Sequence, residues 1–367
     1  MITIKKSFTL SSPYPLSRLG SPETLLFFDI ETTGFSAGRS ALYLIGCLYK
    51  KADGWNMIQW FADTPEAEKD LLHAFFAFLR PFRSLVHFNG DSFDIPYIQK
   101  RCARYGLPYD FTSIDSIDIY KRIGPYRKLL SMDSMKQKAV ESFLGVSRTD
   151  IYSGGELIKV YEDYLDSHSP YLLDLLLLHN EDDLKGMPSL LPVLSYPDFF
   201  QGSFSLGAWN LCRETDPHGT PRPLLKLTCE SPFPVPVPVH ADIPPVCCLV
   251  RQNQLLLSIQ LFEGTLKHFY PNYKDYYYLI YEDTAVHKSV GEYVDKTART
   301  KATEKTCYTK KEGLFLPQFA PLWEPAMKKE LKDKISYASL SDISFQDPVS
   351  FQCYLAQIFT YLGIKTI

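Results

Sequence analysis

Four acidic residues, at three places along the chain, are the best candidates for chemistry. Asp29 and Glu31 come at the end of an apolar run, residues 25–28, that is typical of a buried strand. Residues two apart on an extended backbone point to the same face, so the two carboxylates would lie side by side. Like charges at that spacing repel unless a cation lies between them. The pair therefore indicates a metal site, although a chance pair at an exposed strand end remains an alternative for this motif alone.

Two further motifs carry acidic groups. Asp94 stands at the entrance to a predicted helix, just after a predicted strand at about 84–89. A carboxylate there commonly caps the helix, and on this motif alone the capping role is favoured. His179 and Asp183 are four residues apart in a predicted helix, so they share one face. A surface histidine and a solvated acidic patch are the alternatives for this third motif.

Together the three motifs resemble a known family. Residues 28–34, 89–94 and 179–183 resemble the three exonuclease motifs of the DEDD 3′–5′ exonuclease superfamily, which has the RNase H-like fold. Within it, the chain most resembles the bacterial YprB-like predicted RNase H-like exonucleases, over about residues 24–195. The resemblance implies that the metal-binding carboxylates are Asp29, Glu31, Asp94 and Asp183.

The chain departs from the family pattern at the fifth catalytic residue. One subtype places a tyrosine four residues before the last aspartate, and another places a histidine five residues before it. This chain has His179 four residues before Asp183. The resemblance implies that His179 orients or deprotonates the attacking water, a role that suits an imidazole titrating near neutrality.

The donor atoms define the expected cofactor and reaction. Carboxylate oxygens favour Mg²⁺ or Mn²⁺, and the eight cysteines contain no C-x-x-C pair of the kind found in zinc sites. Two divalent ions about 4 Å apart can stabilise the attacking and leaving oxygens of a phosphodiester displacement. The resemblance implies that Asp29 bridges both ions. We expect a 3′–5′ exonuclease that releases nucleoside 5′-monophosphates from DNA or RNA.

Two other functions remain open at this point. One is an RNase H-like endonuclease that cuts RNA or an RNA–DNA hybrid. The other is a catalytically weak nucleic-acid-binding or scaffold protein on an exonuclease fold. Near the motifs, Asn89 is a candidate for placing the second-motif loop. Asp115 and Asp118 are either supporting groups of the site or part of a solvated strand end.

The elements that must position these residues follow an α/β pattern. We predict an RNase H-like mixed sheet, a three-strand meander plus two further strands, flanked by helices and followed by a smaller α+β domain. The predicted strands lie at about 24–30, 40–49, 55–62, 84–89 and 114–120. The predicted helices lie at about 65–82, near 131–144, 155–166 and 170–186, and in a segment that has Pro96 in its first turn and ends at Gly106. The predicted domains are an irregular lead-in at 1–22, the exonuclease domain at 23–197 and an accessory domain at 198–367.

Composition agrees with an ordinary globular protein of two domains. The 367 residues include 22% charged and 45% hydrophobic residues, with a formal net charge of −3. This charge argues against a protein coated in positive charge but allows a local basic stripe. The start of the chain lacks an apolar signal core, and no apolar stretch is long enough to cross a membrane. A cytoplasmic location is therefore the expectation.

The C-terminal half has a different texture. Prolines between residues 217 and 246 argue against a helix or a central strand there, and residues 249–257 resemble a hairpin. A final helix is predicted to start at Asp347-Pro348. Bases and aromatics mix at 267–278, and cations recur at 296–311, which suits a track for nucleic acid, with single-stranded 3′ ends as the expected substrate. A tyrosine-rich β core beside a solvated basic helix is an equally favoured alternative.

Overall fold

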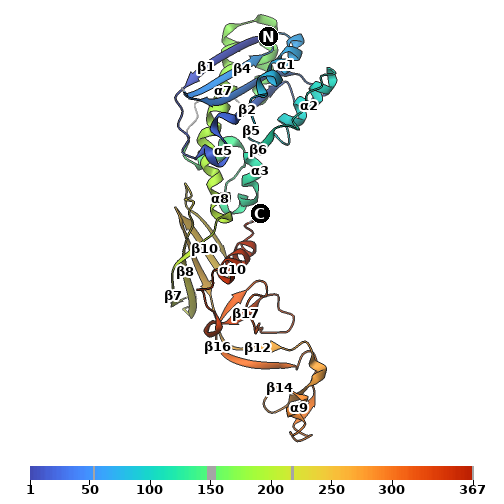
Figure 1. Ribbon diagram of the computed structural model, residues 1–367, viewed down its shortest axis with the longest axis vertical. Coiled ribbons are helices and arrows are strands. Elements are labelled where there is room, and N and C mark those ends of the chain that lie inside the picture. The colour runs from blue at the N-terminus through green and yellow to red at the C-terminus, as the bar shows by residue number, and fades with distance from the viewer. Residues whose placement is uncertain (53, 147–153, 216–218, 366–367) are drawn as a thin grey trace. The chain divides into compact units, whose positions relative to one another are not determined.

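The structure, a computed structural model, describes residues 1–52, 54–146, 154–215 and 219–365 (Figure 1). The chain divides into two units. The first consists of Met1–Arg127 and Ser131–Asp198, and the second of Lys128–Leu130 and Phe199–Ile367. The first unit holds every candidate site residue. Among the described residues, no helix combines the length and the apolar character that a membrane crossing needs.

The first unit is built on a six-stranded mixed sheet. Its strand order is β1-β4-β3-β2-β5-β6; the first four are antiparallel neighbours, and β5 and β6 run parallel to β2. The predicted α/β class, with a three-strand meander and two further strands, is confirmed. The strands are β1 (Ile2–Phe8), β2 (Leu25–Thr32), β3 (Leu42–Lys51), β4 (Gly54–Phe61), β5 (Ser84–His87) and β6 (Asp115–Asp118).

The sixth strand, β1, corrects the prediction of an irregular segment at 1–22. It pairs antiparallel with β4, with Ile2 opposite Phe61. Ile2 and Ile4 are half-buried against the core, while Lys5 is exposed. Charged residues on an edge strand discourage further strand pairing, which explains why this strand looks polar in the sequence.

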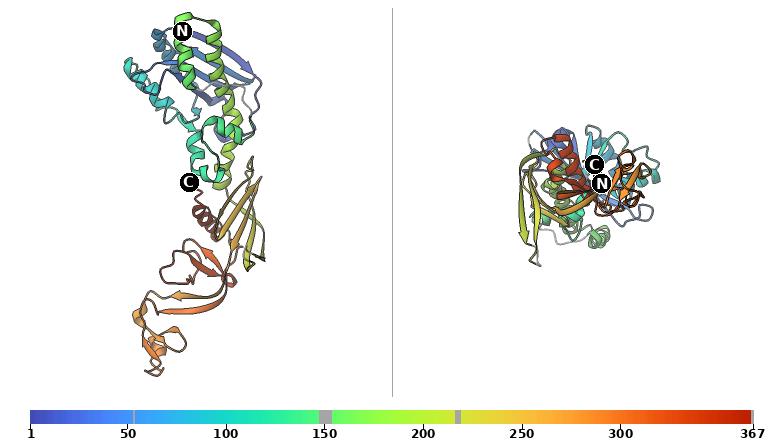
Figure 2. Two further views of the ribbon diagram at one scale, coloured as in Figure 1. Left: turned by 180° about the vertical axis from the view of Figure 1, so that it is seen from behind. Right: turned by 90° about the horizontal axis from the view of Figure 1, so that it is seen from below.

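Helices cover both faces of this sheet. Seen from behind, α6 and α7 lie over one face (Figure 2), and α1 packs on the other. The alternation along β2 follows from this arrangement: Phe28 stacks on Phe75 of α1, whereas Asp29 faces α7. The helices are α1 (Glu68–Leu79), α2 (Asp94–Arg104), α3 (Ile119–Ile123), α4 (Arg127–Leu130), α5 (Gln137–Phe143), α6 (Gly154–Ser167), α7 (Pro170–Leu190) and α8 (Ser195–Gln201).

One predicted helix is shorter than expected. The helix near 131–144 begins only at Gln137 as α5, because Ser131, with a φ of 49°, takes the left-handed conformation that ends α4. The chain then turns through Asp133 and Ser134 before α5 starts. This turn lies beside the candidate site.

The second unit combines three antiparallel sheets with helices, which confirms the predicted α+β character. The sheet orders are β7-β8-β11-β10-β9, β12-β16-β17 and β14-β13-β15. The strands are β7 (Ser205–Thr215), β8 (Pro221–Glu230), β9 (Val239–Ile243), β10 (Val246–Arg251), β11 (Gln254–Gln260), β12 (Phe262–Phe269), β13 (Tyr276–Leu279), β14 (Thr284–His287), β15 (Arg299–Lys301), β16 (Tyr308–Gln318) and β17 (Ser336–Ser339). The helices are α9 (Lys288–Gly291) and α10 (Pro348–Tyr361).

Strand β8 contradicts the expectation that the proline-rich segment has no central strand. It lies between β7 and β11, and its prolines, Pro221 and Pro223, come in its first three residues. The ladder to β11 begins only at Leu224, so neither missing N–H interrupts it.

The other predicted elements of this half have mixed outcomes. The hairpin forms as β10 and β11, and α10 starts where predicted, capped by Asp347. Within 296–311, the described secondary structure consists of strand residues of β15 and β16, so the alternative of a basic helix is wrong. The nucleic-acid track in this half stays a prediction.

Candidate metal centre

Asp29 and Glu31 project from β2 toward α7, as their two-residue spacing predicts. The antiparallel register between β2 and β3 shifts between Glu31 and Thr32. Such an irregularity is common beside functional sites, because it turns the strand and re-aims side chains. Glu31 is buried, with 9% of its surface exposed.

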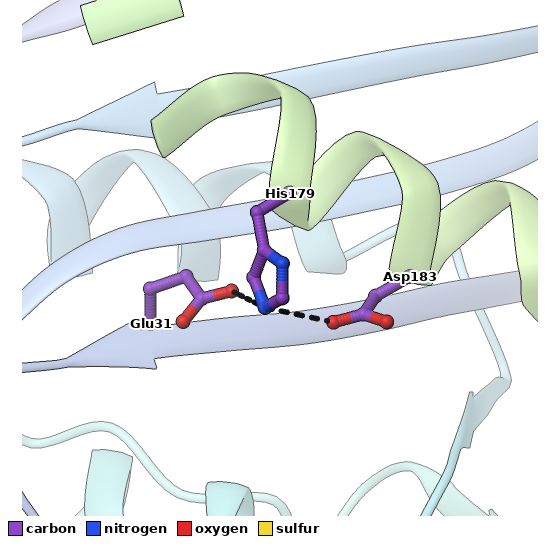
Figure 3. Close-up of side chains that lie close together, drawn as sticks. All are labelled: Glu31, His179 and Asp183. Atoms are coloured by element: carbon purple, nitrogen blue, oxygen red, sulfur yellow. Dashed lines mark ion pairs between the residues drawn. The ribbon is translucent and has the colours of Figure 1, made fainter. Parts of the chain in front are cut away.

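His179 and Asp183 face Glu31 from α7 (Figure 3). The His179 Nε2 atom lies 3.7 Å from Glu31 Oε1 and 3.5 Å from Asp183 Oδ2. The four-residue spacing places the imidazole and the carboxylate one helical turn apart on the same face. The helix and the strand therefore bring these three candidate residues together.

Asp94 joins the group from the first turn of α2. Phe93 occupies the N-cap position and Asp94 is the first helical residue, so Asp94 is not the N-cap residue itself. Burial raises the pKa of Asp94 to about 7, hydrogen bonds from the backbone N–H groups of Asp94 and Ile30 oppose the rise, and the charges of Asp118 and Asp183 add to it. The contact with Ile30 brings this carboxylate next to β2, at the residue that separates Asp29 and Glu31 in the sequence.

The electrostatics of Asp29 show that all four carboxylates share one environment. Burial is the largest cause that raises the pKa of Asp29 well above its usual range. The nearby charges of Asp183, Glu31 and Asp94, in that order, raise it further. Four acids crowded in this way favour a bound cation, which removes the repulsion and supplies a charge partner.

Asn180 holds the Asp29 carboxylate in place. Its Nδ2 donates to Asp29 Oδ2 at 2.9 Å, and its Oδ1 accepts from Gln59 Nε2 at 2.9 Å. Gln59 Nε2 also donates to the backbone carbonyl of Leu177. Asn180 and Gln59 are both fully buried, so this chain of hydrogen-bonded amides holds the Asp29 carboxylate in one position.

The close approach of Asn180 depends on Gly46, which lies directly opposite Asp29 in the register of β2 and β3. A Cβ atom at Gly46 would lie 1.9 Å from Asn180 Oδ1. Asn180, Gln59 and Gly46 are not among the candidate residues of the sequence. A glycine inside an otherwise apolar strand is the signal that could have found them, because it often marks a close contact.

The loop before Asp94 is fixed by Asp118. The Asp118 carboxylate accepts from the backbone N–H groups of Asn89 and Asp91, and Asn89 has a φ of 66°. Asp118 is 3% exposed, whereas Asp115 is exposed. Of the two acids on β6, Asp118 therefore supports the site and Asp115 belongs to the solvated strand end.

A second histidine–carboxylate group serves the same loop. His87, Asp91 and Asp118 lie close enough together to hold a metal ion. However, His87 Nδ1 accepts from Gly90 N, and its Nε2 lies 2.8 Å from Ser116 Oγ. These ring nitrogens are engaged in fixing the loop, so the group is structural.

The donor set of the main group fits a hard divalent cation. One oxygen or nitrogen from each of Glu31, His179 and Asp183 lies within 4.8 Å of the others. Asp29, from the same strand as Glu31, and Asp94, from α2, add two further carboxylates. A predominantly oxygen environment of this kind suits Mg²⁺ or Mn²⁺.

Comparisons with known proteins relate the first unit to one superfamily. Residues 26–195 match the RNase_H superfamily. The chain is 30% identical over 172 residues to the uncharacterised protein YprB of Bacillus subtilis (strain 168), a match that covers 45% of this chain and 40% of YprB. It is 29% identical over 164 residues to DNA polymerase 1 of Aeropyrum pernix, covering 43% of this chain and 15% of the polymerase. The chain thus spans less than half the length of either relative.

Among solved structures, a family B DNA polymerase from Pyrobaculum calidifontis overlaps 55% of this chain and 29% of its own, with 16% identity and a TM-score of 0.40. That overlap is too small to argue from. Residues 26–195 are therefore similar to the RNase H superfamily, and the first unit has an RNase H-like fold. The predicted resemblance to this superfamily and to the YprB-like proteins is confirmed.

Proposed function

We propose that the chain is a metal-dependent 3′–5′ exonuclease that releases nucleoside 5′-monophosphates from DNA or RNA. The observation that carries this proposal is the convergence of four carboxylates and an imidazole at one place on an RNase H-like sheet. They come from β2, α2 and α7, which are far apart in the sequence. The residues are Asp29, Glu31, Asp94, His179 and Asp183.

Each side chain has a role that its position supports. Two Mg²⁺ or Mn²⁺ ions, when bound, would polarise the scissile phosphate and stabilise the attacking and leaving oxygens. Asp29, which lies near the charges of Asp183, Glu31 and Asp94, would help to hold both ions. Glu31 and Asp183 would hold one ion, and Asp94 would hold the other. The His179 Nε2 atom, between Glu31 and Asp183, would orient the attacking water and take its proton.

The test is degradation of oligonucleotides labelled at the 5′ end, as single- and double-stranded DNA and RNA, with Mn²⁺ or Mg²⁺. The proposal predicts a ladder shortened from the 3′ end, mononucleotide products and no activity in EDTA. The Asp29→Ala and Asp183→Ala variants should each lose at least about 1,000-fold in rate, because each removes a metal ligand. Asp115→Ala is the matched control, since it removes an exposed acid of the same sheet.

Circular substrates and binding measurements separate the alternatives. An exonuclease leaves a covalently closed single-stranded circle intact, whereas an endonuclease cuts it. If the chain binds the linear oligonucleotide but degrades it with neither Mn²⁺ nor Mg²⁺, the scaffold alternative is favoured. Full activity in both Asp29→Ala and Asp183→Ala would contradict the proposed mechanism.

A further inference from the structure

A cavity of about 690 Å³ opens beside the candidate metal centre. His179 and Asp183 form part of its wall, and the rest comes from the chain around β5, α3 and the start of α5. A volume of this size is typical of sites that hold a ligand with several rings or groups. The cavity is therefore large enough for at least one nucleotide, next to the place where the chemistry would occur.

Cations form part of the cavity wall. Arg127, Lys136 and Lys138 are exposed and contribute to its wall, with Asp133 as an acidic neighbour. Arg127 and Lys136 form no ion pair with any residue that the structure describes. A polyanion that approaches four carboxylates needs positive charge nearby, and these side chains supply it within the first unit.

Two aromatic rings complete the wall. Phe88 and Tyr120 are half-buried, and their ring centroids lie 5.8 Å apart in an edge-to-face arrangement. Rings held by each other at the wall of a cavity offer a surface on which an unpaired base can stack. The faces of bases inside a duplex are already stacked on their neighbours, so this surface suits a single strand.

The cations are tied to the metal centre through Gln137, which lies between the two lysines in the sequence. Its Nε2 atom donates to the backbone carbonyl of Asp183 at 3.0 Å and to Glu141 Oε1 at 3.0 Å. The start of α5 is thereby held against α7 at the residue that belongs to the candidate site. The positions of Lys136 and Lys138 are consequently fixed relative to the carboxylates.

We propose that this cavity binds single-stranded nucleic acid next to the bond that is cut. Phe88 and Tyr120 stack on a base, and Arg127, Lys136 and Lys138 contact phosphates. This inference rests on the proposed function for the identity of the reaction, but it concerns binding and is tested separately. It places the strand-holding surface in the first unit, within reach of the catalytic residues.

The test uses the full chain with Asp29→Ala, so that binding is measured without degradation. The probe is a fluorescein-labelled 12-nucleotide oligothymidylate, and the readout is fluorescence anisotropy between 50 and 200 mM salt. Adding Arg127→Gln and Lys136→Gln should weaken binding about 10-fold and lower the salt slope by about 1.4, or about 0.7 per lost phosphate contact. Adding Tyr120→Leu should weaken binding about 5- to 100-fold with an unchanged salt slope, because stacking carries no charge.

The matched control is the pair Lys69→Gln and Lys100→Gln, which removes the same charge from exposed positions on α1 and α2. It should change affinity less than twofold. Equal losses in the control and cavity pairs would overturn the proposal, because they would show diffuse attraction instead of a defined site. Tighter binding of the corresponding duplex, with the same loss in the cavity pair, would also overturn it.

Kinetics separate this inference from the proposed function. In the otherwise unmodified chain, Arg127→Gln with Lys136→Gln should raise KM about 10-fold and leave kcat within twofold, because these groups bind without taking part in the reaction. Loss of binding in the cavity variants of a chain that degrades nothing would support the inference and contradict the function. Degradation of the substrate, with binding and KM unchanged in the cavity variants, would support the proposed function and contradict this inference.

Discussion

The space above Gly46 gives the sharpest test of how this chain places Asp29. In Gly46→Ala, the new methyl group would lie 1.9 Å from Asn180 Oδ1 and 2.6 Å from Leu184 Cδ1. Ordinary contact begins at 3.4 Å, so the amide must move by about 3.4 − 1.9 = 1.5 Å. The Leu184 methyl can turn away more easily, because it is the end of a flexible side chain. Asn180 cannot move without losing the partners that hold it.

The magnitude follows from what Asn180 must give up. Overpacking a core by one methyl group costs about 1–3 kcal/mol. The displaced amide would also lose its hydrogen bonds to Gln59 and Asp29, at about 1 kcal/mol each. We therefore expect Gly46→Ala to lower the free energy of unfolding of the first unit by about 3–5 kcal/mol. Asp29 would lose its support, so we also expect weaker Mn²⁺ binding.

Urea unfolding of the full chain measures the loss, and hydrogen exchange of peptides from β3 and α7 assigns it to the first unit. Isothermal titration calorimetry with Mn²⁺ measures the second effect. Gly38→Ala is the control, since a Cβ there meets nothing within 4 Å, and it should cost less than about 0.5 kcal/mol.

A double-mutant cycle makes the reasoning refutable. Asn180→Ala removes the oxygen that the Gly46→Ala methyl would strike. The two substitutions together should therefore cost at least about 1 kcal/mol less than the sum of their separate costs. Additive costs would show that Gly46 and Asn180 do not compete for one space, and the account of how Asp29 is held would be wrong.

Three other predictions follow from the same geometry. Burial raises the pKa of Asp94 to about 7, so the folded protein keeps a proton on this carboxylate that the unfolded chain loses near pH 4. The free energy of unfolding of the metal-free protein should therefore fall by up to about 4 kcal/mol between pH 4 and 8. Urea midpoints in EDTA should show a flatter pH dependence for Asp94→Asn, and an unchanged dependence would contradict the assignment. His179→Ala should lower kcat by about 100- to 10,000-fold while Mn²⁺ affinity, measured by calorimetry, stays within threefold; a loss of affinity as large as that of Asp183→Ala would make the imidazole a ligand instead. Lys6→Ala should cost about 0.5–1 kcal/mol in urea unfolding, because Lys6 Nζ lies 2.5 Å from the Glu181 carboxylate of α7, and no change would show that β1 does not secure that helix.

Local patterns in the sequence were enough to predict much of the site. The spacing of Asp29 and Glu31 places both on one strand face, and that of His179 and Asp183 places both on one helix face, as observed. Strand and helix periods are local properties, so motifs written within one element can be interpreted without the fold. The assignment of these residues as catalytic or metal-binding remains a proposal.

Features that depend on distant pairing were missed. The apolar residues of β1 are Ile2, Ile4 and Phe8, too few to predict a strand from the sequence alone. Its pairing with β4 joins residues more than 40 positions apart, which no local pattern encodes. The contact of Asn180 with Asp29 and Gly46 likewise requires residue 180 of α7 to lie directly over this pair of facing residues in β2 and β3. Asn180 is followed by three acidic residues, so the sequence suggests a charged surface at this point of α7. Glu181, the first of them, instead pairs with Lys6 and Lys185.

The unusual histidine spacing also has an explanation in the orientation of α7. Successive residues of a helix are rotated by about 100°, so the residues before Asp183 point in quite different directions. Leu178, five positions before Asp183, is 51% exposed, whereas His179 is 8% exposed and its Nε2 lies between Glu31 and Asp183. A histidine five residues before Asp183 would thus start from the solvent side of this helix. Asn180, the next residue, meets Gly46 and fixes the rotation of α7, so on this helix the imidazole reaches the carboxylates from position 179.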